Sequence, residues 1–312
     1  PDHSETVLEL SYDLDSVRAQ FDPDAATRSD LWRYRPLLPV SGGDVVTLGE
    51  GWSDLIAAPD TGDELGVDLG LKLEGTNPTG SAKDRGSAVV ATSAREHGYG
   101  EVVCASTGNA AASIAAYAAR GTLECSLFVP ERLSEAKAVQ PLVYDASLVT
   151  VDGGYGAARK RCREYATDRD VIDRSAGANP LTAAGGQTLG FELAEQTDEP
   201  AWIAVSMGNG GTIADLWDGF RLFAELGYIS ATPRLLGVQA AGCPVLHESI
   251  RSADTATPAT DGTCADSIDV DEPHRADDAR RAIEESRGAT ITVSDDQIRG
   301  ALRRLGRDEG VF

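Results

Sequence analysis

Lysine is scarce in this chain, and acidic residues are in large excess. Only four of its 28 basic residues are lysines, so 24 are arginines, against 50 aspartates and glutamates; the net charge is −22 and the pI about 4.5. This balance excludes a typical nucleic-acid-binding protein, which presents a net basic face. It is typical of proteins from salt-loving microbes, in which high salt screens self-repulsion, although an ordinary acidic cytosolic protein has the same signature.

Long apolar runs and paired cysteines are also missing. The longest apolar stretch, residues 110–119, is interrupted by Ser113 and is shorter than the ~18 residues that a membrane helix needs. No secretory signal opens the chain, and Pro1 in place of Met indicates a trimmed start. Five cysteines without a C-x-x-C pair argue against a disulfide framework or a zinc site. We therefore expect a soluble, cytoplasmic protein with no membrane partner and no metal.

The first sixty residues are polar and irregular and predict an N-terminal arm, in which residues 31–39 and 44–51 are the parts expected to pack. From there, short apolar runs alternate with helical patterns, which predicts buried parallel strands joined by helical crossovers. The strands are expected at 69–73, 102–105, 125–129, 148–151, 171–172, 202–205, 235–238 and 290–293. The helices are expected at 84–97, 109–120, 134–142, 156–167, 212–226 and 295–305.

The last of these helices has Ser294 as its expected N-cap and Gly306 at its expected C-terminus. Residues 251–264, rich in Thr, Ala, Asp and Pro, predict an exposed loop. A chain of 312 residues has room for two ordinary domains. We expect an arm at 1–60 that packs on the larger domain, a smaller α/β domain at 61–168 and a larger one at 169–312.

Residues 77–86 read Asn-Pro-Thr-Gly-Ser-Ala-Lys-Asp-Arg-Gly, where a strand feeds a turn and Lys83 begins a helix. The positive end of a helix and burial both lower the pKa of an ammonium group. A neutral amine is the form that attacks a carbonyl, so the position favours a reactive lysine. The alternative is a lysine that caps a surface turn.

A second segment, Ser106-Thr107-Gly108-Asn109-Ala110, follows the expected strand 102–105 and leads into a helix. Free N–H groups at such a helix start suit a carboxylate, and the Asn109 amide could bond a phenolate-like oxygen. An ordinary strand-to-helix turn looks the same, so this segment alone is a weak signal.

The third segment, residues 206–212, reads Ser-Met-Gly-Asn-Gly-Gly-Thr and again joins a strand to an amphipathic helix. Glycines let successive N–H groups turn inward, and this creates an anion-binding nest at a helix N-terminus. Neither a dinucleotide fingerprint nor a nucleotide P-loop is present. A tight turn without a ligand is the alternative.

All three segments follow the carboxyl ends of expected parallel strands, where ligands bind in open α/β sheets. Together they call for a ligand with a phosphate, an aldehyde for the lysine and an oxygen for an amide. Pyridoxal 5'-phosphate has all three.

With these motifs the chain resembles the fold-type II pyridoxal-phosphate enzymes related to the tryptophan synthase β-subunit, and within them the threonine synthases. The resemblance runs from about residue 31 to the end and includes Leu-Trp-Arg-Tyr-Arg at 31–35 and Leu-Gly-Glu-Gly at 48–51. It implies two doubly wound open-sheet α/β domains with the cofactor cleft between them. Because relatives are often dimers, it also suggests a homodimer.

The resemblance implies a role for each motif. Lys83 would hold the cofactor as a Schiff base and move protons at the α and β carbons of a small amino-acid substrate. The other implied contacts are Asn109 with the ring oxygen; the amides of Gly208, Asn209, Gly210, Gly211 and Thr212 with the phosphate; and Ser106, Thr107 and the Asn109–Ala110 backbone with the substrate carboxylate. The implied reaction converts O-phospho-L-homoserine and water to L-threonine and phosphate.

Several positions depart from the family pattern on the substrate side. Trp-Ser-Asp-Leu replaces Thr-Pro-Leu at 52–55, which places Ser53 and Asp54 there; Ala82 replaces Phe, Gln187 stands where Lys is common, and residues 263–268 differ from an Ala-Thr-Ala-Ile-like stretch. The family's Glu-Pro-Ser/Thr segment, which supplies a hydroxyl to the pyridine nitrogen, has no counterpart before Phe312, so no residue is assigned that role.

Two other hypotheses fit the same motifs. A threonine/serine dehydratase-like deaminase would use the same lysine and phosphate loop but would release a 2-oxo acid and ammonia. A non-catalytic paralogue would bind the cofactor, or only keep the fold, and would serve as a partner or regulator.

Overall fold

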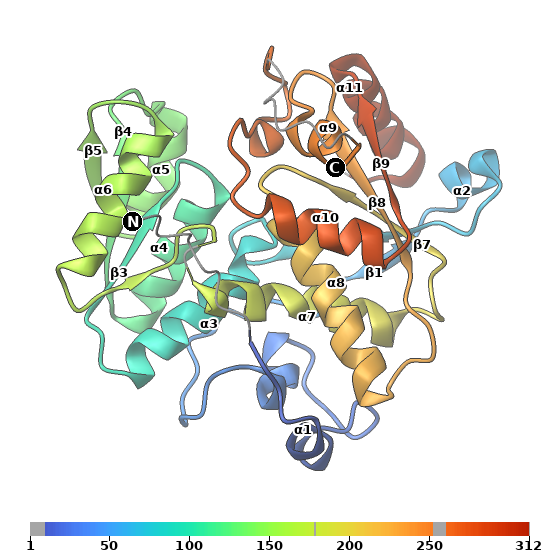
Figure 1. The fold of residues 1–312 in the computed structure, drawn as a ribbon, viewed down its shortest axis with the longest axis horizontal. Coiled ribbons are helices and arrows are strands. Elements are labelled where there is room, and N and C mark those ends of the chain that lie inside the picture. Colours follow the sequence, from blue (N-terminus) through green and yellow to red (C-terminus); the bar gives the residue numbers. More distant parts are fainter. Residues whose placement is uncertain (1–9, 178, 252–259, 312) are drawn as a thin grey trace. The chain divides into compact units, whose positions relative to one another are not determined.

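The computed structural model describes residues 10–177, 179–251 and 260–311 (Figure 1). The chain divides into two compact units: unit 1 is Pro1–Trp52 with Glu74–Leu189, and unit 2 is Ser53–Leu73 with Gly190–Phe312. These boundaries differ from the expected ones at 60 and 168. Residues 169–189 belong to unit 1 because strand β6 (Ile172–Asp173) pairs with strand β3 (Glu101–Ala105) of that unit. We describe each unit by itself.

Unit 1 is built around a parallel four-stranded sheet with strand order β5-β4-β3-β6. Strands β4 (Glu124–Pro130) and β5 (Ser147–Val151) complete the sheet, and helices occupy the crossovers, as the alternation predicts. The helices of unit 1 are α1 (Leu14–Gln20), α3 (Lys83–Glu96), α4 (Asn109–Gly121), α5 (Glu135–Val143), α6 (Tyr155–Thr167) and the first part of α7 (Pro180–Gln196), with short helical turns η1 (Leu31–Leu37) and η2 (Glu74–Thr76).

The sheet of unit 1 is buried on both faces. On one face, Val102, Leu127 and Val129 pack against residues of α3 and α4. One of these helix residues is Ile114. On the other, Phe128 and its neighbours pack against α6. Successive strand residues point to opposite faces, so the near-continuous apolar runs in the sequence reflect this burial on both sides.

The N-terminal segment is joined to unit 1 through a buried carboxylate. Glu50 is fully buried and accepts hydrogen bonds from Trp32 Nε1, from the Tyr117 hydroxyl and from the Leu48 backbone N–H, each at 2.8–2.9 Å. Leu31 and Trp32 pack with α3 residues such as Val89. The arm therefore belongs with the unit that carries Lys83, whereas we expected it to pack on the C-terminal domain.

Unit 2 contains a parallel three-stranded sheet in the order β7-β8-β9 and a short antiparallel pair, β1 and β2. Helices α8 and α10 contact this sheet (Figure 1). The elements of unit 2 are β1 (Leu55–Ala57), α2 (Pro59–Leu65), β2 (Gly70–Lys72), the last part of α7, β7 (Trp202–Ser206), α8 (Gly211–Leu226), β8 (Arg234–Ala240), α9 (Val245–Arg251), η3 (Asp266–Ile268), α10 (Ala276–Glu285), β9 (Ala289–Val293), α11 (Asp295–Arg304) and a π-turn η4 (Leu305–Glu309).

The β1–β2 hairpin is fastened to the rest of unit 2 by a buried ion pair. Lys72 Nζ lies 2.8 Å from Glu192 Oε2 and also donates to the Ser53 carbonyl oxygen and to Gln196 Oε1. Because Lys72 has these acceptors, its position is explained by packing within unit 2.

Every predicted strand and helix is present, but β2 pairs antiparallel with β1 and does not lie in a parallel sheet as expected. Strand β1 and helices α1, α2 and α9 were not predicted. Helices α7 and α10 were not predicted: apolar and small residues lie on all sides of α7, so it lacks the one-sided pattern of a surface helix. Ser294 caps α11 as expected, through a reciprocal bond pair with Gln297. The expected end at Gly306 is wrong, because the chain continues into η4 and Gly310 takes the left-handed conformation that ends it. Most of the loop expected at 251–264 lies outside the described residues.

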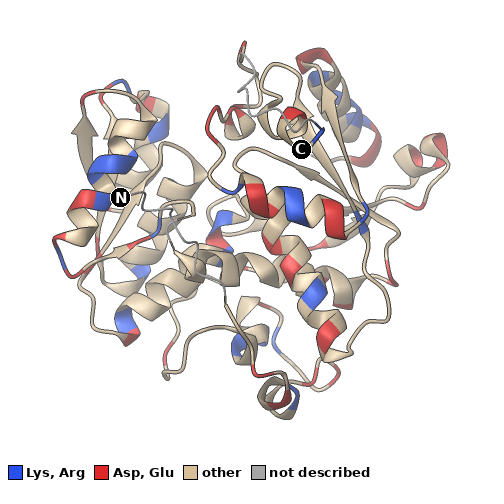
Figure 2. Ribbon diagram, in the orientation of Figure 1, with Lys and Arg blue, Asp and Glu red and all other residues tan. Residues whose placement is uncertain are grey.

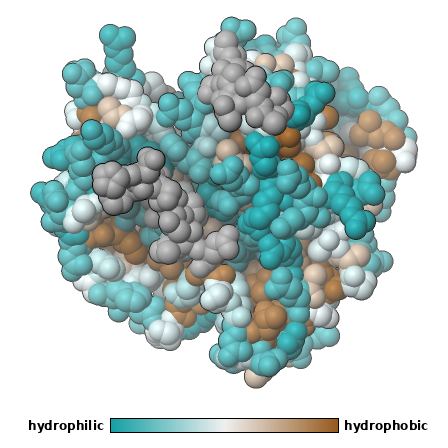
Figure 3. Space-filling model, viewed as in Figure 1, coloured by the Kyte–Doolittle hydropathy of each residue, from teal (hydrophilic) through white to brown (hydrophobic). Residues whose placement is uncertain are grey.

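The surface of unit 2 carries charges of both signs. Figure 2 shows acidic and basic residues alternating along α10, and Figure 3 shows a hydrophilic surface over the same helix. Within the described ranges, no helix has the length and apolar character needed to cross a membrane.

Candidate active site

Lys83 is the first residue of α3, as the sequence predicts. Its side chain is half-buried, and its backbone N–H donates to Ser81 Oγ at 3.3 Å. Gly80 precedes it in the left-handed conformation, with φ of 87°, and closes the turn by donating to the Asn77 carbonyl oxygen at 2.7 Å. The lysine thus stands where a tight turn meets the positive end of a helix dipole.

The polar side chains around Lys83 fix the turn. Asn77 Oδ1 accepts from the Gly51 N–H at 3.0 Å. The Asp84 carboxylate accepts from both the N–H and the hydroxyl of Thr79. The side chains of Asn77 and Asp84 therefore stabilise the turn, and they fix the position of the Lys83 backbone.

Arg85 is the third residue whose side chain stabilises the turn. Its guanidinium is buried and forms two hydrogen bonds with the Glu74 carboxylate, at 2.6 and 2.8 Å, and one with Thr188 Oγ1. Such a two-point pair fixes the guanidinium plane. Glycines allow the close approach beside it: a Cβ on Gly185 would lie 2.2 Å from the Arg85 carbonyl oxygen.

The loop from β3 to α4 holds the predicted carboxylate-binding residues in the same unit as Lys83. Gly108 is the N-cap position of α4, which has no side-chain cap, and its N–H donates to Ser106 Oγ at 3.3 Å. Thr107 and Ala110 are half-buried, and Asn109 is exposed. The start of α4 thus presents backbone N–H groups next to small polar side chains, an arrangement that suits an anion.

Two consecutive residues connect the lysine turn to this loop. Arg174 Nη2 donates to the Lys83 carbonyl oxygen at 3.3 Å, and the next residue, Ser175, accepts from the Ala105 N–H at 2.8 Å. The Tyr155 hydroxyl donates to the Ala105 carbonyl oxygen, and burial raises its pKa. None of these supporting residues was predicted, because Arg174, Ser175 and Tyr155 lie outside every motif.

The glycine loop in unit 2 joins β7 to α8. Gly210 has φ of 86° and occupies the N-cap position of α8, without a side-chain cap. The Asn209 side chain and carbonyl oxygen accept hydrogen bonds from the backbone of His274 and Arg275, at 2.5 and 3.1 Å. A Cβ on Gly210 would lie 2.6 Å from the Arg275 carbonyl oxygen, so glycine is required there.

This loop fits the phosphate of pyridoxal phosphate. Among the described residues, none accepts a hydrogen bond from the N–H of Gly208, Asn209 or Gly210. A Cβ on Gly211 would meet no atom closer than 4.0 Å, so the space beside the helix start is open. Unpaired N–H groups at the N-terminus of a 16-residue helix are the standard protein partners of a phosphate group.

The positions that depart from the family pattern have different surroundings in the structure. Gln187 Oε1 accepts from the Tyr12 hydroxyl at 3.0 Å in unit 1. In unit 2, Ser53 is buried, whereas the Asp54 side chain is exposed. Ala82 is the N-cap residue of α3.

The departing segment at 263–268 lies against the glycine loop. A Cβ on Gly208 would be 2.9 Å from Ile268 Cα and 3.0 Å from the Ser267 carbonyl oxygen. Asp295 holds the start of the segment through Thr263 Oγ1 and the Cys264 N–H. The segment thus supports the loop from the side.

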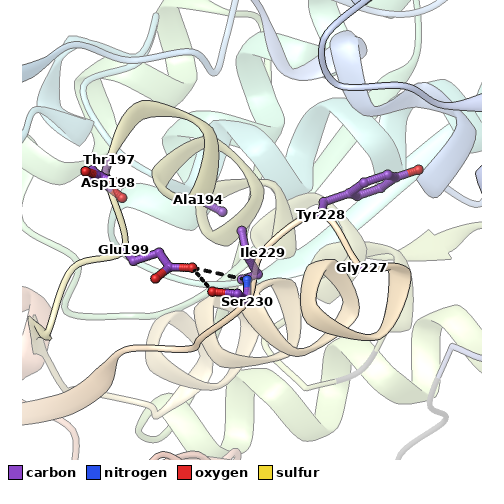
Figure 4. A pocket seen from close by; sticks show the side chains of 8 residues that line it. All are labelled: Ala194, Thr197, Asp198, Glu199, Gly227, Tyr228, Ile229 and Ser230. Atoms are coloured by element: carbon purple, nitrogen blue, oxygen red, sulfur yellow. Dashed lines mark hydrogen bonds between the residues drawn. The ribbon is translucent and has the colours of Figure 1, made fainter.

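Unit 2 also has an open groove of about 510 Å³, near the ends of α7 and α8 (Figure 4). Its lining includes Glu199, whose carboxylate accepts from the N–H and hydroxyl of Ser230. These hydrogen bonds lower the pKa of Glu199. None of the predicted site residues lines this groove.

Three residues that could ligate a metal lie close together in unit 2: the Cys243 thiol and the carboxylates of Asp269 and Asp271 are within 4.8 Å of one another. Both aspartates are exposed, and the thiol donates to the Val270 carbonyl oxygen. Exposed acidic groups of this kind are common without an ion, so the cluster gives no metal assignment.

Comparisons with solved structures agree with the fold of each unit. Solved structures with a similar fold include maize serine racemase (TM-score 0.72, 20% identity, 83% of this chain and 76% of that one). The processed threonine deaminase isoform 2 from Solanum lycopersicum is similar too (TM-score 0.70, 21% identity, 82% and 73%). At these identities the likeness shows the fold alone: a fold-type II α/β structure with parallel sheets.

Sequence comparisons define the family. The family model described as pyridoxal-phosphate dependent enzyme matches residues 46–312. Threonine synthase from Mycobacterium tuberculosis (strain ATCC 25618 / H37Rv) is 37% identical over 285 residues, covering 89% of this chain and 77% of its own. Threonine synthase from Methanocaldococcus jannaschii is 34% identical over 315 residues, covering 98% and 78%. This chain belongs to the pyridoxal-phosphate-dependent enzyme family, in the group that contains the threonine synthases.

Proposed function

We propose that this protein is a pyridoxal-phosphate-dependent threonine synthase, which converts O-phospho-L-homoserine and water to L-threonine and phosphate. The observation that carries the proposal is Lys83, the first residue of α3, in a turn that hydrogen bonds of Asn77, Asp84 and Arg85 hold in place. Curated relatives from bacteria and archaea, matched over most of this chain, are threonine synthases.

In this proposal the residues around Lys83 in unit 1 and the glycine loop in unit 2 have separate tasks. Lys83 holds the cofactor through its amine and afterwards moves protons at the α and β carbons of the substrate. Ser106, Thr107 and the backbone at Ala110 bind the substrate carboxylate, and Asn109 bonds the oxygen of the cofactor ring. The bound cofactor supplies an electron sink that stabilises negative charge on the substrate carbons.

The glycine loop anchors the phosphate of the cofactor. The N–H groups of residues 208–212 supply hydrogen bonds without a charged side chain, and the α8 dipole adds a favourable potential. The protein thus contributes both the orientation of the reacting groups and the stabilisation of charge.

The reaction itself is the first test. The chain is incubated with O-phospho-L-homoserine and cofactor at multimolar salt, because dilute buffer can unfold so acidic a protein. We expect threonine and inorganic phosphate in equal amounts, identified by mass spectrometry. Release of 2-oxobutanoate or pyruvate would favour the deaminase hypothesis instead.

Cofactor attachment is tested by the visible absorbance band of the wild-type protein, which we expect Lys83→Ala to lose. A non-catalytic paralogue would keep the band and form no product. If wild-type protein with added cofactor shows no such band, the enzyme hypotheses fail together.

The glycine loop offers a test in which two variants differ by one charge. Gly211 has open space beside it, so Gly211→Asp and Gly211→Asn should both fold. The new carboxylate would repel the phosphate, and we expect Gly211→Asp to weaken pyridoxal phosphate binding at least about tenfold relative to Gly211→Asn. Equal affinities, measured by titration of the absorbance band, would contradict a phosphate at this loop.

A further inference from the structure

Two fully buried arginines of unit 1 differ in how their charge is compensated. Arg85 is paired with the Glu74 carboxylate, as described above. Arg174 is 1% exposed, and within the described ranges no carboxylate lies within ion-pair distance of it. A buried charge without a counter-charge is costly, so such a residue calls for a functional explanation.

Arg174 directs its guanidinium at the first turn of α3. Nε donates to Ser87 Oγ at 3.1 Å, and Nη2 donates to the Lys83 carbonyl oxygen at 3.3 Å. Its own N–H donates to the Val103 carbonyl oxygen at 2.8 Å, which fixes it at the end of β6 beside β3. A full positive charge is thereby held next to the backbone of Lys83.

The other charged groups of this region have partners of their own. The Asp84 carboxylate is bound by Thr79, and Asp173 Oδ1 accepts from the Ser175 N–H and faces Cys162 Sγ. Arg159 adds a second positive charge and donates to the Ala176 carbonyl oxygen at 2.6 Å.

The buried thiol of Cys104 is another group near this charge. Burial raises the pKa of Cys104 to about 12, and the positive charge of Arg174 works against that increase. The guanidinium therefore favours negative groups, and disfavours a second positive charge, in this part of unit 1.

We infer that Arg174 is a positioning residue that holds the first turn of α3 and keeps the Lys83 amine in its neutral, reactive form. This inference rests on the proposed function, in which Lys83 is the reactive lysine. A fixed positive charge destabilises an ammonium group nearby, and the α3 dipole acts in the same direction. Because the guanidinium lacks a counter-charge among the described residues, its effect on the amine is not cancelled by an ion pair.

The test measures the protonation of Lys83 in the full chain freed of cofactor. Acetic anhydride labels only neutral amines, so the labelling rate at each residue, followed by peptide mass spectrometry across pH, gives the pH midpoint of that amine. We expect Arg174→Gln to raise the Lys83 midpoint by about one pH unit or more, which lowers its labelling rate about tenfold near neutral pH. The exposed Lys160 on α6 is the internal control, and its midpoint should not change.

A second variant, Arg174→Lys, keeps a positive charge in this place. It should leave the Lys83 midpoint nearer to the wild-type value than Arg174→Gln does, whereas a purely structural role of the guanidinium would give the two variants the same midpoint. If neither variant folds, the wild-type protein decides the question, because a Lys83 midpoint no lower than that of Lys160 contradicts an effect of the charge.

An unchanged Lys83 midpoint in folded Arg174→Gln, or equal midpoints for folded Arg174→Gln and Arg174→Lys, overturns the inference. The proposed function is tested apart from it, because cofactor attachment and product formation are measured on the wild-type protein. If those assays fail while the Lys83 midpoint shifts in Arg174→Gln, the proposed enzyme function is rejected, and the electrostatic effect of Arg174 on Lys83 still holds.

Discussion

The two parallel sheets of this protein differ in how they are covered. In unit 1, residues 102–105 of β3 are all buried, and helices pack on both faces of the sheet. In unit 2, alternate residues of β7 are exposed, including Trp202 at 48%, and Ile291 on β9 is 41% exposed. Register places Trp202 and Ile291 on the same face, opposite the face that carries the buried Leu235.

This difference shows that the lysine turn of unit 1 and the glycine loop of unit 2 are held in different ways. Parallel sheets are normally buried on both faces, and unit 1 follows that rule. Its lysine turn therefore rests on a core closed on both sides. The glycine loop follows β7, an edge strand, and is supported by segments beside it, through Asn209 with residues 274–275 and through Gly208 with residues 267–268.

The largest effect is expected from a cavity in the closed core of unit 1. Leu127 is fully buried on β4, so Leu127→Ala should lower the free energy of unfolding by about 2–5 kcal/mol. The measurement is urea unfolding at multimolar salt, with hydrogen exchange to show that β3 and β4 open together. A loss below about 1 kcal/mol would mean that this core is less tightly packed than the two-sided burial indicates.

A pH-dependent effect is expected at Glu50, which joins the N-terminal segment to unit 1. Burial raises the pKa of Glu50 above its ordinary value of 4.5, so the folded state keeps a proton that the unfolded state has lost. The contribution of the protonated Glu50 to the free energy of unfolding is fully present below about pH 4.5. It is lost as the pH rises through the higher pKa of the folded state. Glu50→Gln cannot titrate, and its free energy of unfolding relative to the wild type should rise over that interval and then level off.

Urea unfolding of both proteins at a series of pH values measures this difference. The comparison cancels the titration of the many surface carboxylates, which the two proteins share. A difference that stays constant with pH would show that the Glu50 carboxyl titrates alike in the folded and unfolded states.

Much of the fold could be predicted from the sequence because its signals are local. Apolar runs gave the strands of both sheets, and helical periodicity gave α3, α4, α6 and α8. Helix α7 could not be found in this way, since apolar residues on all its sides leave no periodicity. Helix α10 carried a readable signal: acidic residues in its first turn, followed by the buried Ala279, Ala282 and Ile283 at helical spacing.

In the candidate site, too, the residues with a local sequence signal could be predicted and the others could not. Lys83 and the glycine loop stand out in the sequence, because a tight turn, a helix start and several glycines fall close together. The residues that support them do not stand out in the sequence, because their roles depend on contacts between distant segments. Glu50 meets Trp32 and Tyr117, and Arg174 reaches the first turn of α3 from ninety-one residues away.

The smallest effect is expected on the open face of the unit 2 sheet. The Trp202 ring is half-exposed, and its main partner is the guanidinium of Arg234, 5.5 Å from the ring centre on the neighbouring strand. Trp202→Ala removes that contact and the buried half of the ring but leaves no closed cavity, so it should lower the free energy of unfolding by about 1–2 kcal/mol, less than Leu127→Ala does. Arg234→Ala, which loses the same contact and keeps the ring, is the matched variant. A cost for Trp202→Ala as large as that of Leu127→Ala would show that this face is covered in solution, and the contrast between the two sheets would then disappear.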